Sequence, residues 1–259
     1  MNKNNTFKAL FAALFIVMSA NAQVTPNTVA PAPETDAYHV IEANLQVRSN
    51  YIWRGFKVSN SPITNADLHY ISRNGSFKAG FWGGASFDGT YKEFDYYASY
   101  TKGNFKAAIW DINNFSNYPD ADIFDYKNNT TSHFVDVGIA YTIPFKKTPL
   151  TLSWNTIVAG RDFHIDENGK ATNNYSHYVQ ADLTLWKQQD RNLHAVVAGA
   201  FAFGQEVHFY GEDPNLVNVG LVYNQDVKVL RNYILPVSLT AMFNPEKKIG
   251  ALQVVASLF

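Results

Sequence analysis

The stretch from Phe77 to Thr101, FKAGFWGGASFDGTYKEFDYYASYT, decides the fold of this chain. On both sides of Asp88, apolar residues occupy every second position, and small or polar residues occupy most of the positions between them. A period of two is typical of a β-strand whose two faces have different surroundings. The residues from Asp88 to Thr90 make a short connection, so the stretch predicts two consecutive strands.

The same alternation continues in both directions, from Tyr38 to the last residue. We predict about twelve strands of roughly ten residues each, and no helix of useful length beyond the N-terminal segment. The expected strand segments are 41–48, 65–70, 77–87, 93–101, 105–109, 135–143, 150–158, 179–185, 192–204, 215–224, 232–243 and 248–259.

So many strands fit either a soluble sandwich or barrel, or a barrel that spans a membrane. Strands of roughly ten residues, tilted by about 45°, are long enough to cross a bilayer. We therefore predict an all-β protein, a transmembrane antiparallel up-and-down β-barrel over residues 38–259. A soluble periplasmic β-protein is the alternative architecture, because periodicity alone does not tell which face of a strand is buried.

The lengths of the connections favour the membrane barrel, since outer-membrane barrels have short periplasmic turns and longer extracellular loops. Only 88–90 and 244–247 are short on the expected outer side. The short connections of the other side are Asn74-Gly75, Lys102-Gly103, 144–149 and 187–191, and the long connections are 55–62, 113–132, 161–174 and 204–215.

Aromatic residues near strand ends also favour a membrane barrel, because Tyr and Trp gather at the two membrane–water interfaces. The terminal Phe259 resembles the signal that the outer-membrane insertion machinery recognises. The residues that we expect in the interfacial girdles are Tyr51, Trp53, Tyr91, Trp110, Tyr175 and Trp186.

The N-terminus predicts export. Lys3 and Lys8 precede the apolar segment 9–20, and Ala20-Asn21-Ala22 is a small-x-small cleavage site, as in a secretory signal peptide. We predict a signal peptide at 1–22, a flexible lead-in at 23–37, and the bacterial outer membrane as the location of the barrel.

Composition excludes several classes of protein. The chain has 259 residues with no Cys, which rules out disulfides, thiolate metal sites, thiol catalysis and a lipid-anchored cysteine. Its 21 basic and 22 acidic residues nearly balance, so nucleic acid is not an expected partner. Charged residues make up 17% and aromatic residues 15%, while the mean hydropathy is only −0.20. This combination fits strands with one face toward hydrocarbon and the other toward water.

Three short blocks carry a family resemblance: Ser49-Asn50-Tyr51-Ile52-Trp53-Arg54-Gly55, Phe77-Lys78-Ala79-Gly80-Phe81-Trp82-Gly83 and Glu93-Phe94-Asp95-Tyr96-Tyr97. They resemble the "S-x-Y-x-aromatic-R-G", "G-x-W" and "E-x-D-x-Y" blocks of the TorF-type porins, which are small Gram-negative outer-membrane barrels. The resemblance implies a porin-like barrel and marks Tyr51, Trp53, Arg54 and Gly55 as family-motif residues. It does not imply a particular solute.

Two interpretations of this motif remain open. In the architectural one, which we favour, Trp53 belongs to the outer girdle, Arg54 contacts lipopolysaccharide phosphates and Gly55 forms a turn. In the functional one, Arg54 lies at a constriction of the lumen and acts as a selectivity charge.

The polar faces of the strands predict the lining of the lumen. Acidic residues outnumber basic ones there, which would favour cations or neutral solutes over anions. Alternatively, these charges pair across strands and only stabilise the interior. The pore-lining candidates are Glu42, Arg48, Asp67, Lys78, Glu93, Asp95, Lys106, Asp136 and Asp182, with His69 and His194 beside them.

Enzymatic and metal sites have little support. Ser132-His133 and Ser176-His177 are direct neighbours and would point to opposite faces of a strand, so we expect no enzyme. Asp120, Asp122 and Asp125 lack the spacing of a calcium loop, and residues 166–169 have the sequence of a hairpin turn. We expect neither a metal nor another cofactor.

We therefore expect a monomeric, narrow diffusion channel for small hydrophilic solutes, with membrane lipid, lipopolysaccharide and the insertion machinery as further partners. The alternative is a non-conducting surface barrel whose aromatic loops bind a partner or glycan through Phe115, Tyr118, Phe124, Tyr126, Phe209 and Tyr210. Barrels of about twelve strands lie between side-chain-filled and water-filled ones, so the lumen is either open or plugged.

Overall fold

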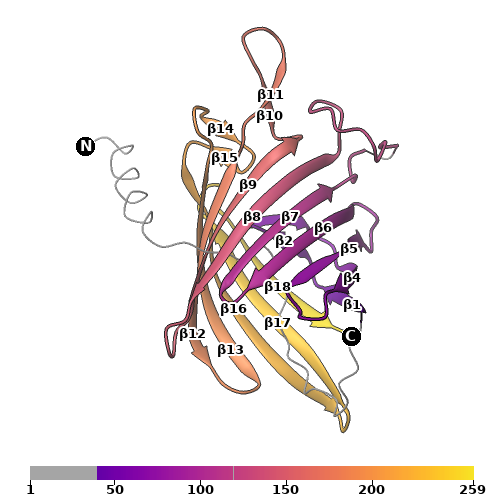
Figure 1. The fold of residues 1–259 in the computed structure, drawn as a ribbon, viewed down its shortest axis with the longest axis vertical. Coiled ribbons are helices and arrows are strands. Elements are labelled where there is room, and N and C mark those ends of the chain that lie inside the picture. Colours follow the sequence, from indigo (N-terminus) through magenta and orange to yellow (C-terminus); the bar gives the residue numbers. More distant parts are fainter. Residues whose placement is uncertain (1–39, 119) are drawn as a thin grey trace, which may run out of the picture.

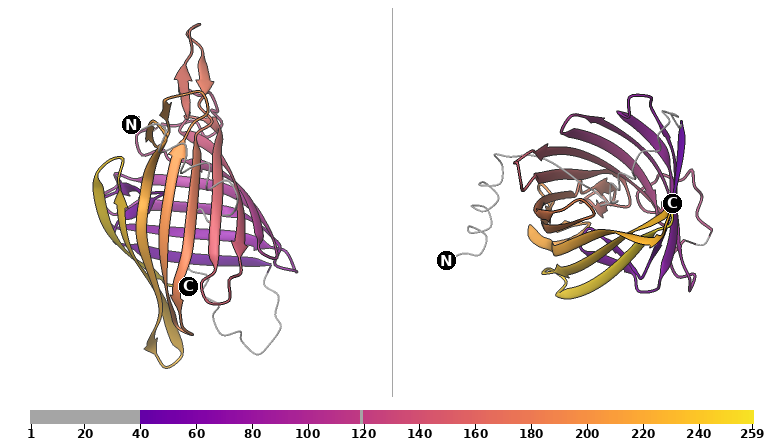
Figure 2. Two further views of the ribbon diagram at one scale, coloured as in Figure 1. Left: turned by 90° about the vertical axis from the view of Figure 1, so that its left-hand side faces the viewer. Right: turned by 90° about the horizontal axis from the view of Figure 1, so that it is seen from below.

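The computed structural model describes residues 40–118 and 120–259. The predicted signal peptide and lead-in lie outside these residues and stay predictions. Within them, twelve strands form one closed antiparallel barrel, which confirms the predicted fold (Figure 1; Figure 2, right). The barrel strands are β1 (Ile41–Arg48), β4 (Ile63–Ile71), β5 (Phe77–Ser86), β6 (Lys92–Lys102), β7 (Phe105–Asn113), β8 (His133–Ile143), β9 (Leu150–Gly160), β12 (His177–Lys187), β13 (Arg191–Phe201), β16 (Asn215–Leu230), β17 (Tyr233–Asn244) and β18 (Ile249–Ser257).

Pairing of the first and last strands closes the barrel. Gln46 to Arg48 of β1 pair with Ser257 to Val255 of β18, while the whole of β1 pairs with β4 on its other side. The chain end continues this contact, because the Leu45 amide donates to the carbonyl oxygen of Phe259 at 3.0 Å. Closure leaves no barrel strand with an unpaired edge, which is the requirement for a sheet in hydrocarbon.

The two ends of the barrel differ. The end that carries the short turns and the C-terminus is called the inner end, and the end that carries the long connections is called the outer end. Three of those connections form small hairpins: β2 (Tyr51–Trp53) with β3 (Phe56–Ser59), β10 (Phe163–Ile165) with β11 (Ala171–Asn173), and β14 (Val207–His208) with β15 (Gly211–Glu212). The β10–β11 hairpin projects beyond the outer end, whereas β2 lies within the barrel (Figure 1).

The faces of the strands are inverted relative to a soluble protein. Leu68, Phe81 and Leu221 point outward and are 47–50% exposed, while Asn65 and Asp95 point into the barrel and are at most 3% exposed. An apolar exterior around a closed barrel is stable only against hydrocarbon. The distribution therefore excludes the soluble periplasmic alternative.

The expected aromatic girdle is wrong for four of its six residues. Tyr51 and Tyr91 are each 2% exposed, and Trp53 and Trp110 pack against the core clusters inside the barrel. Trp110 occupies the inward phase of β7, and the other three belong to or cover the β2–β3 hairpin, which folds inward. Only Tyr175 and Trp186, 53% and 39% exposed, lie on the outside.

The apolar exterior predicts that a charged substitution destabilises the barrel most at the middle of a strand. Replacing Leu221, which is mid-strand in β16, with Arg should destabilise the barrel by about 2–4 kcal/mol, because a cation at the bilayer midplane loses its hydration. Leu230→Arg, at the inner end of the same strand, should cost only about 0–1 kcal/mol. Urea unfolding in lipid vesicles measures both, and equal costs would contradict a membrane-spanning β16.

Candidate functional site: the occluded lumen

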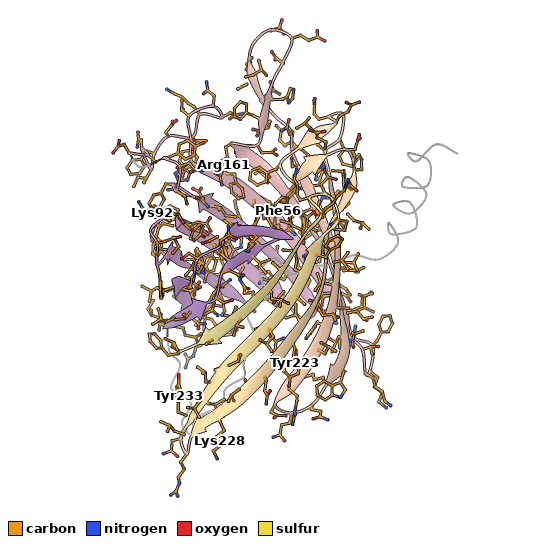
Figure 3. The ribbon with its side chains drawn as sticks, turned by 180° about the vertical axis from the view of Figure 1, so that it is seen from behind. Phe56, Lys92, Arg161, Tyr223, Lys228 and Tyr233 are labelled. Atoms are coloured by element: carbon orange, nitrogen blue, oxygen red, sulfur yellow. The ribbon has the colours of Figure 1, made fainter. Side chains whose placement is uncertain are left out.

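The β2–β3 hairpin, which we name the plug hairpin (Tyr51–Ser59), occupies the lumen. Its first residue, Tyr51, stacks on Trp82 of β5 with ring centroids 5.9 Å apart. Trp53 and Phe56 pack against a buried apolar cluster contributed by the opposite wall of the barrel. Figure 3 shows Phe56 on this hairpin, between the strands of the wall. The hairpin therefore crosses the lumen and does not extend over the membrane surface.

The tip of the plug hairpin fits a tight space. Arg54 and Gly55 form its turn with φ values of 46° and 85°. A Cβ on Gly55 would collide with the backbone oxygen of Val217 on β16, so both the conformation and the space require glycine. The Asn244 side-chain amide of β17 donates to the Gly55 carbonyl oxygen at 3.1 Å. The tip is thus anchored to β16 and β17, on the side of the barrel that β18 joins to β1.

Arg54 fastens the hairpin to the opposite wall. Its guanidinium donates to both carboxylate oxygens of Asp136 on β8, at 3.0 and 2.5 Å, and to the Tyr210 hydroxyl at 2.5 Å. Arg54 is 8% exposed and Asp136 is 1% exposed. The planar guanidinium of Arg54 lies over the rings of Trp53 and Tyr178, with its Cζ atom 4.7 and 5.1 Å from the two ring centroids. We name this buried pair, Arg54 with Asp136, the latch.

The architectural interpretation of the motif is therefore wrong. Trp53 and Arg54 lie inside the barrel, away from lipid headgroups, and Gly55 alone keeps its predicted place in a turn. The sequence did not reveal this because a hairpin of seven to nine residues can fold outward or inward with the same local pattern. Contacts with distant residues fix the direction: Asp136 on β8 lies 82 residues from Arg54, and Asn244 on β17 lies 189 residues from Gly55.

A second segment from the outer end completes the occlusion. The β14–β15 connection brings Tyr210, 1% exposed, against the plug hairpin, and places Phe209 beside Phe134 and Trp53, with ring centroids 4.9 and 6.2 Å apart. The expectation that Phe209 and Tyr210 are surface-binding aromatics is thus wrong. Phe124 and Tyr126 do remain exposed, at 81% and 47%.

The apolar cluster around the plug was missed from the sequence, although a signal existed. Near the outer ends of several strands, large apolar residues occupy positions whose phase is otherwise polar and inward-facing. Aromatic pairs of this kind contribute about 0.5–1.5 kcal/mol beyond the burial of their area. The members of the cluster are Ile112, Phe134, Ile157, Tyr178, Ala198, Ala200, Tyr210 and Val217.

Two cavities lie on either side of the plug hairpin. The outer one, about 140 Å³, is lined by Trp53 together with Glu93 and Arg161. The inner one, about 110 Å³, is lined by Trp53 together with Arg48 and Gln180. Because Trp53 contributes to both, its indole ring and the latch beside it form the partition between them.

All nine pore-lining candidates lie on strand positions whose phase faces the lumen, but they form separate groups. Asp136 belongs to the latch, and Glu93 lines the outer cavity with Asp95 next to it on β6. Arg48 lines the inner cavity, where it donates to Asn65 and Gln46 at 2.8 Å.

The remaining candidates are nearer the inner end. Glu42 lies 3.3 Å from the ring of His69, which also contacts Asp67, and the Lys78 amine is 3.3 Å from the same ring. Asp182 pairs with His194 at 2.8 Å, and Lys106 is half-buried on β7. Whether these groups line a conducting path stays a prediction.

The residues considered for chemistry have structural partners. Ser132 donates to Asn113 and Ser176 to Asp162, while His133 contacts Asp111 and His177 contacts Thr156. Within residues 40–118 and 120–259, no hydrogen bond joins a serine hydroxyl to a histidine ring. No group of three or more metal-binding side chains occurs among the same residues.

Asp166 behaves as a turn residue. Its carboxylate accepts hydrogen bonds from the amides of Asn168 and Lys170, both at 2.9 Å, and Gly169 has a φ of 76°. These hydrogen bonds hold the pKa of Asp166 below its usual value. The segment 166–169 is therefore the tip of the β10–β11 hairpin, as the sequence predicted. Asp122 and Asp125 similarly accept hydrogen bonds from the amides of Phe124 and Lys127.

The fold and the lumen together define a class. A closed antiparallel barrel with an apolar exterior and a polar interior is a bacterial outer-membrane β-barrel. In the part of the chain that the structure describes, no helix has the length and apolar character needed to cross a membrane. No protein-family model and no curated protein matches the sequence.

Several solved structures are similar. One is the NanC porin, with 9% identity, coverage of 82% of this chain and 97% of that chain, and a TM-score of 0.44. Another is the outer membrane protein OprD from Pseudomonas aeruginosa, with 9% identity, 85% and 65% coverage, and a TM-score of 0.38. A third is the translocator domain of the autotransporter NalP from Neisseria meningitidis, with 8% identity, 98% and 93% coverage, and a TM-score of 0.37.

Proposed function

We propose that this protein is a narrow diffusion channel for small hydrophilic solutes, gated by the plug hairpin, and that a single chain forms the pore. The observation that carries the proposal is the layered lumen: cavities on both sides of one hairpin, which is attached to the far wall only by non-covalent contacts. A partition that can unfasten converts such a barrel into a pore without breaking any pairing of the twelve wall strands.

The polar inner lumen supports a path for hydrophilic solutes. Polar side chains point inward from all sides of the barrel, among them Gln46, Asn65, Ser153 and Gln180. Water and hydrophilic solutes in the lumen can form hydrogen bonds with these side chains. An apolar core would offer them no such partners. The apolar cluster is confined to the level of the plug hairpin, so the barrier is local.

We further propose a mild preference for cations and neutral solutes over anions. Asp136 is neutralised by Arg54, and Arg48 and Arg161 lie near Glu93 and Asp95. Over the lumen as a whole, six acidic side chains (Glu42, Asp67, Glu93, Asp95, Asp136 and Asp182) face five basic ones (Arg48, Arg54, Lys78, Lys106 and Arg161). This small acidic excess makes the local potential weakly negative.

Planar-bilayer recordings of the refolded protein test the channel. We expect small, salt-dependent currents with weak cation selectivity in the reversal potential under a salt gradient. Asp67→Asn should reduce the selectivity and Lys78→Gln should increase it, because each removes one charge from the same inner region. Arg73→Gln, at an exposed position beyond the inner end of β4, is the matched control and should change neither. A correctly folded barrel without ion current would contradict the proposal.

A second candidate is a surface barrel whose loops bind a protein partner or glycan. The 114–132 connection favours it, because Ile123, Phe124 and Tyr126 are 46%, 81% and 47% exposed, and neighbouring exposed apolar side chains are typical of interaction sites. Glycan-array or cell-binding assays that respond to Phe124→Ser, combined with absent conductance, would favour this function over the channel.

The remaining proposed partners follow from the surface. Lipid and lipopolysaccharide would cover the apolar exterior, and the insertion machinery would recognise the C-terminal strand through Phe259, whose side chain is 69% exposed.

A further inference from the structure

The outer cavity has the composition of a ligand site. Its walls are aromatic, formed by Trp53 and Phe56 of the plug hairpin together with Phe134 and Phe209. Two of the polar side chains that line it, Glu93 and Arg161, carry opposite charges. Its volume of about 140 Å³ is more than four times the roughly 30 Å³ that one water occupies in the liquid. The space is therefore sufficient for a small organic molecule.

Arg161 is held in place but lacks an anionic partner. Its backbone amide donates to the His133 carbonyl oxygen at 3.0 Å, and its guanidinium lies over the rings of Phe134 and Phe209, at 5.1 and 5.8 Å. The side chain makes no hydrogen bond and no ion pair with the described residues, and its Nε atom is buried without a partner. Figure 3 shows Arg161 near the outer end, above Phe56. A guanidinium oriented in this way is suited to a carboxylate.

Glu93 provides the complementary charge on the other side. It is 8% exposed and makes no ion pair within 4 Å among residues 40–118 and 120–259. Asp95, next to it on the same face, is 0% exposed and has one buried carboxylate oxygen without a hydrogen bond. Glu93 and Arg161 thus line one cavity, near enough to interact electrostatically but not in contact.

A ligand that carries both charges fits this arrangement. A carboxylate can bind Arg161, an ammonium group can bind Glu93, and an apolar side chain can pack on the aromatic rings, which also attract the ammonium group. We propose that the outer cavity binds a small zwitterion, namely an α-amino acid with an apolar side chain. The proposal rests on the channel function for the consequence that this molecule is a transported solute.

Calorimetry on the refolded barrel in detergent tests the binding, with L-leucine as the probe. Two analogues remove one charge each: leucinol lacks the carboxylate and 4-methylpentanoate lacks the ammonium group. We expect L-leucine to bind and each analogue to bind about tenfold or more weakly, because each leaves one charged group of the cavity unpaired. Quenching or a shift of tryptophan emission should accompany binding, since Trp53 lines the cavity.

Substitutions assign the two charges. Arg161→Gln should weaken L-leucine binding about tenfold or more while leaving leucinol binding unchanged, and Glu93→Gln should do the same with 4-methylpentanoate as the unaffected analogue. Arg191→Gln is the matched control, because Arg191 lies in β13 at the inner end and pairs with Asp190. Circular dichroism confirms that each variant is folded, and Arg161→Lys, which retains the charge, should recover part of the affinity.

Several results would overturn the inference: no binding of L-leucine, equal binding of leucinol, or equal affinity in the Arg161→Gln variant. Binding of glucose in place of L-leucine would show that the cavity recognises a neutral sugar. The two proposals fail separately. L-leucine binding by a barrel without current contradicts the channel alone, whereas current without L-leucine binding contradicts the ligand alone.

Discussion

Replacing residues 49–62 with a two-residue Asn-Gly turn should raise the single-channel conductance several-fold. Arg48 and Ile63 are directly paired across β1 and β4, so a two-residue turn of this type can join the strands without changing their register. The change removes the plug hairpin, with Trp53 and the latch residue Arg54. The two cavities then become one continuous path through the barrel.

The β10–β11 hairpin offers a matched control for this deletion. The Asn174 amide donates to the Asp162 carbonyl oxygen at 3.0 Å, so a short linker can join these residues and replace 163–173. This hairpin projects beyond the barrel (Figure 2, left), and its loss should leave the conductance unchanged. Equal conductance of the two deletion variants in planar bilayers would show that the plug hairpin does not limit flow.

The deletion should also lower stability. Loss of the hairpin exposes the inward rings of Tyr178 and Phe134 to water, and burial of such rings stabilises a barrel by about 1.5–3 kcal/mol each. Chemical unfolding, followed by tryptophan fluorescence, measures this cost. A deletion variant that conducts no better and is equally stable would contradict the packing of the plug.

The latch should produce the second large effect. Asp136→Asn or Arg54→Met alone should destabilise the protein by about 3–5 kcal/mol, because each leaves a buried charge without its partner. Asp136 is 1% exposed and accepts both hydrogen bonds from the same guanidinium, so solvent can compensate little of the loss. Both single variants should also conduct more, since the hairpin loses its attachment to β8.

A double variant separates the charge from the packing. Arg54→Met combined with Asp136→Leu removes both charges, and it should be less destabilised than either single variant, because no unpaired charge remains in the lumen. Urea unfolding of the four proteins provides the coupling energy. Additive destabilisation would show that the two residues do not act as a pair. Asp182→Asn is the control, since Asp182 pairs with His194 near the inner end.

The wall of the barrel was predictable from the sequence because its signal is local. Alternation such as Leu68 and Tyr70 against Asp67 and His69 recurs along the chain, and in β4 burial follows it, with His69 buried and Leu68 and Tyr70 exposed. The turn at Asp166 was predictable for the same reason, because its hydrogen bonds join residues two to four positions apart.

The candidate site was harder to predict from the sequence. Glu93 was expected in the lumen, but Arg161, its counterpart in the outer cavity, was not, because the sequence placed it at the edge of a long loop. The favoured interpretation placed Trp53 and Arg54 at the membrane surface, and only the alternative placed Arg54 in the lumen. A strand pattern carries no information on whether a loop folds over the rim or into the barrel.

The sequence by itself thus predicted a closed β-barrel with about twelve strands, since alternation and turn spacing both follow from neighbouring residues. Tertiary structure alone decided that the lumen is occluded. The latch joins residues 82 positions apart, and the glycine at the hairpin tip is required by the backbone of β16. Such contacts arise only when the barrel closes and brings opposite walls within reach of one side chain.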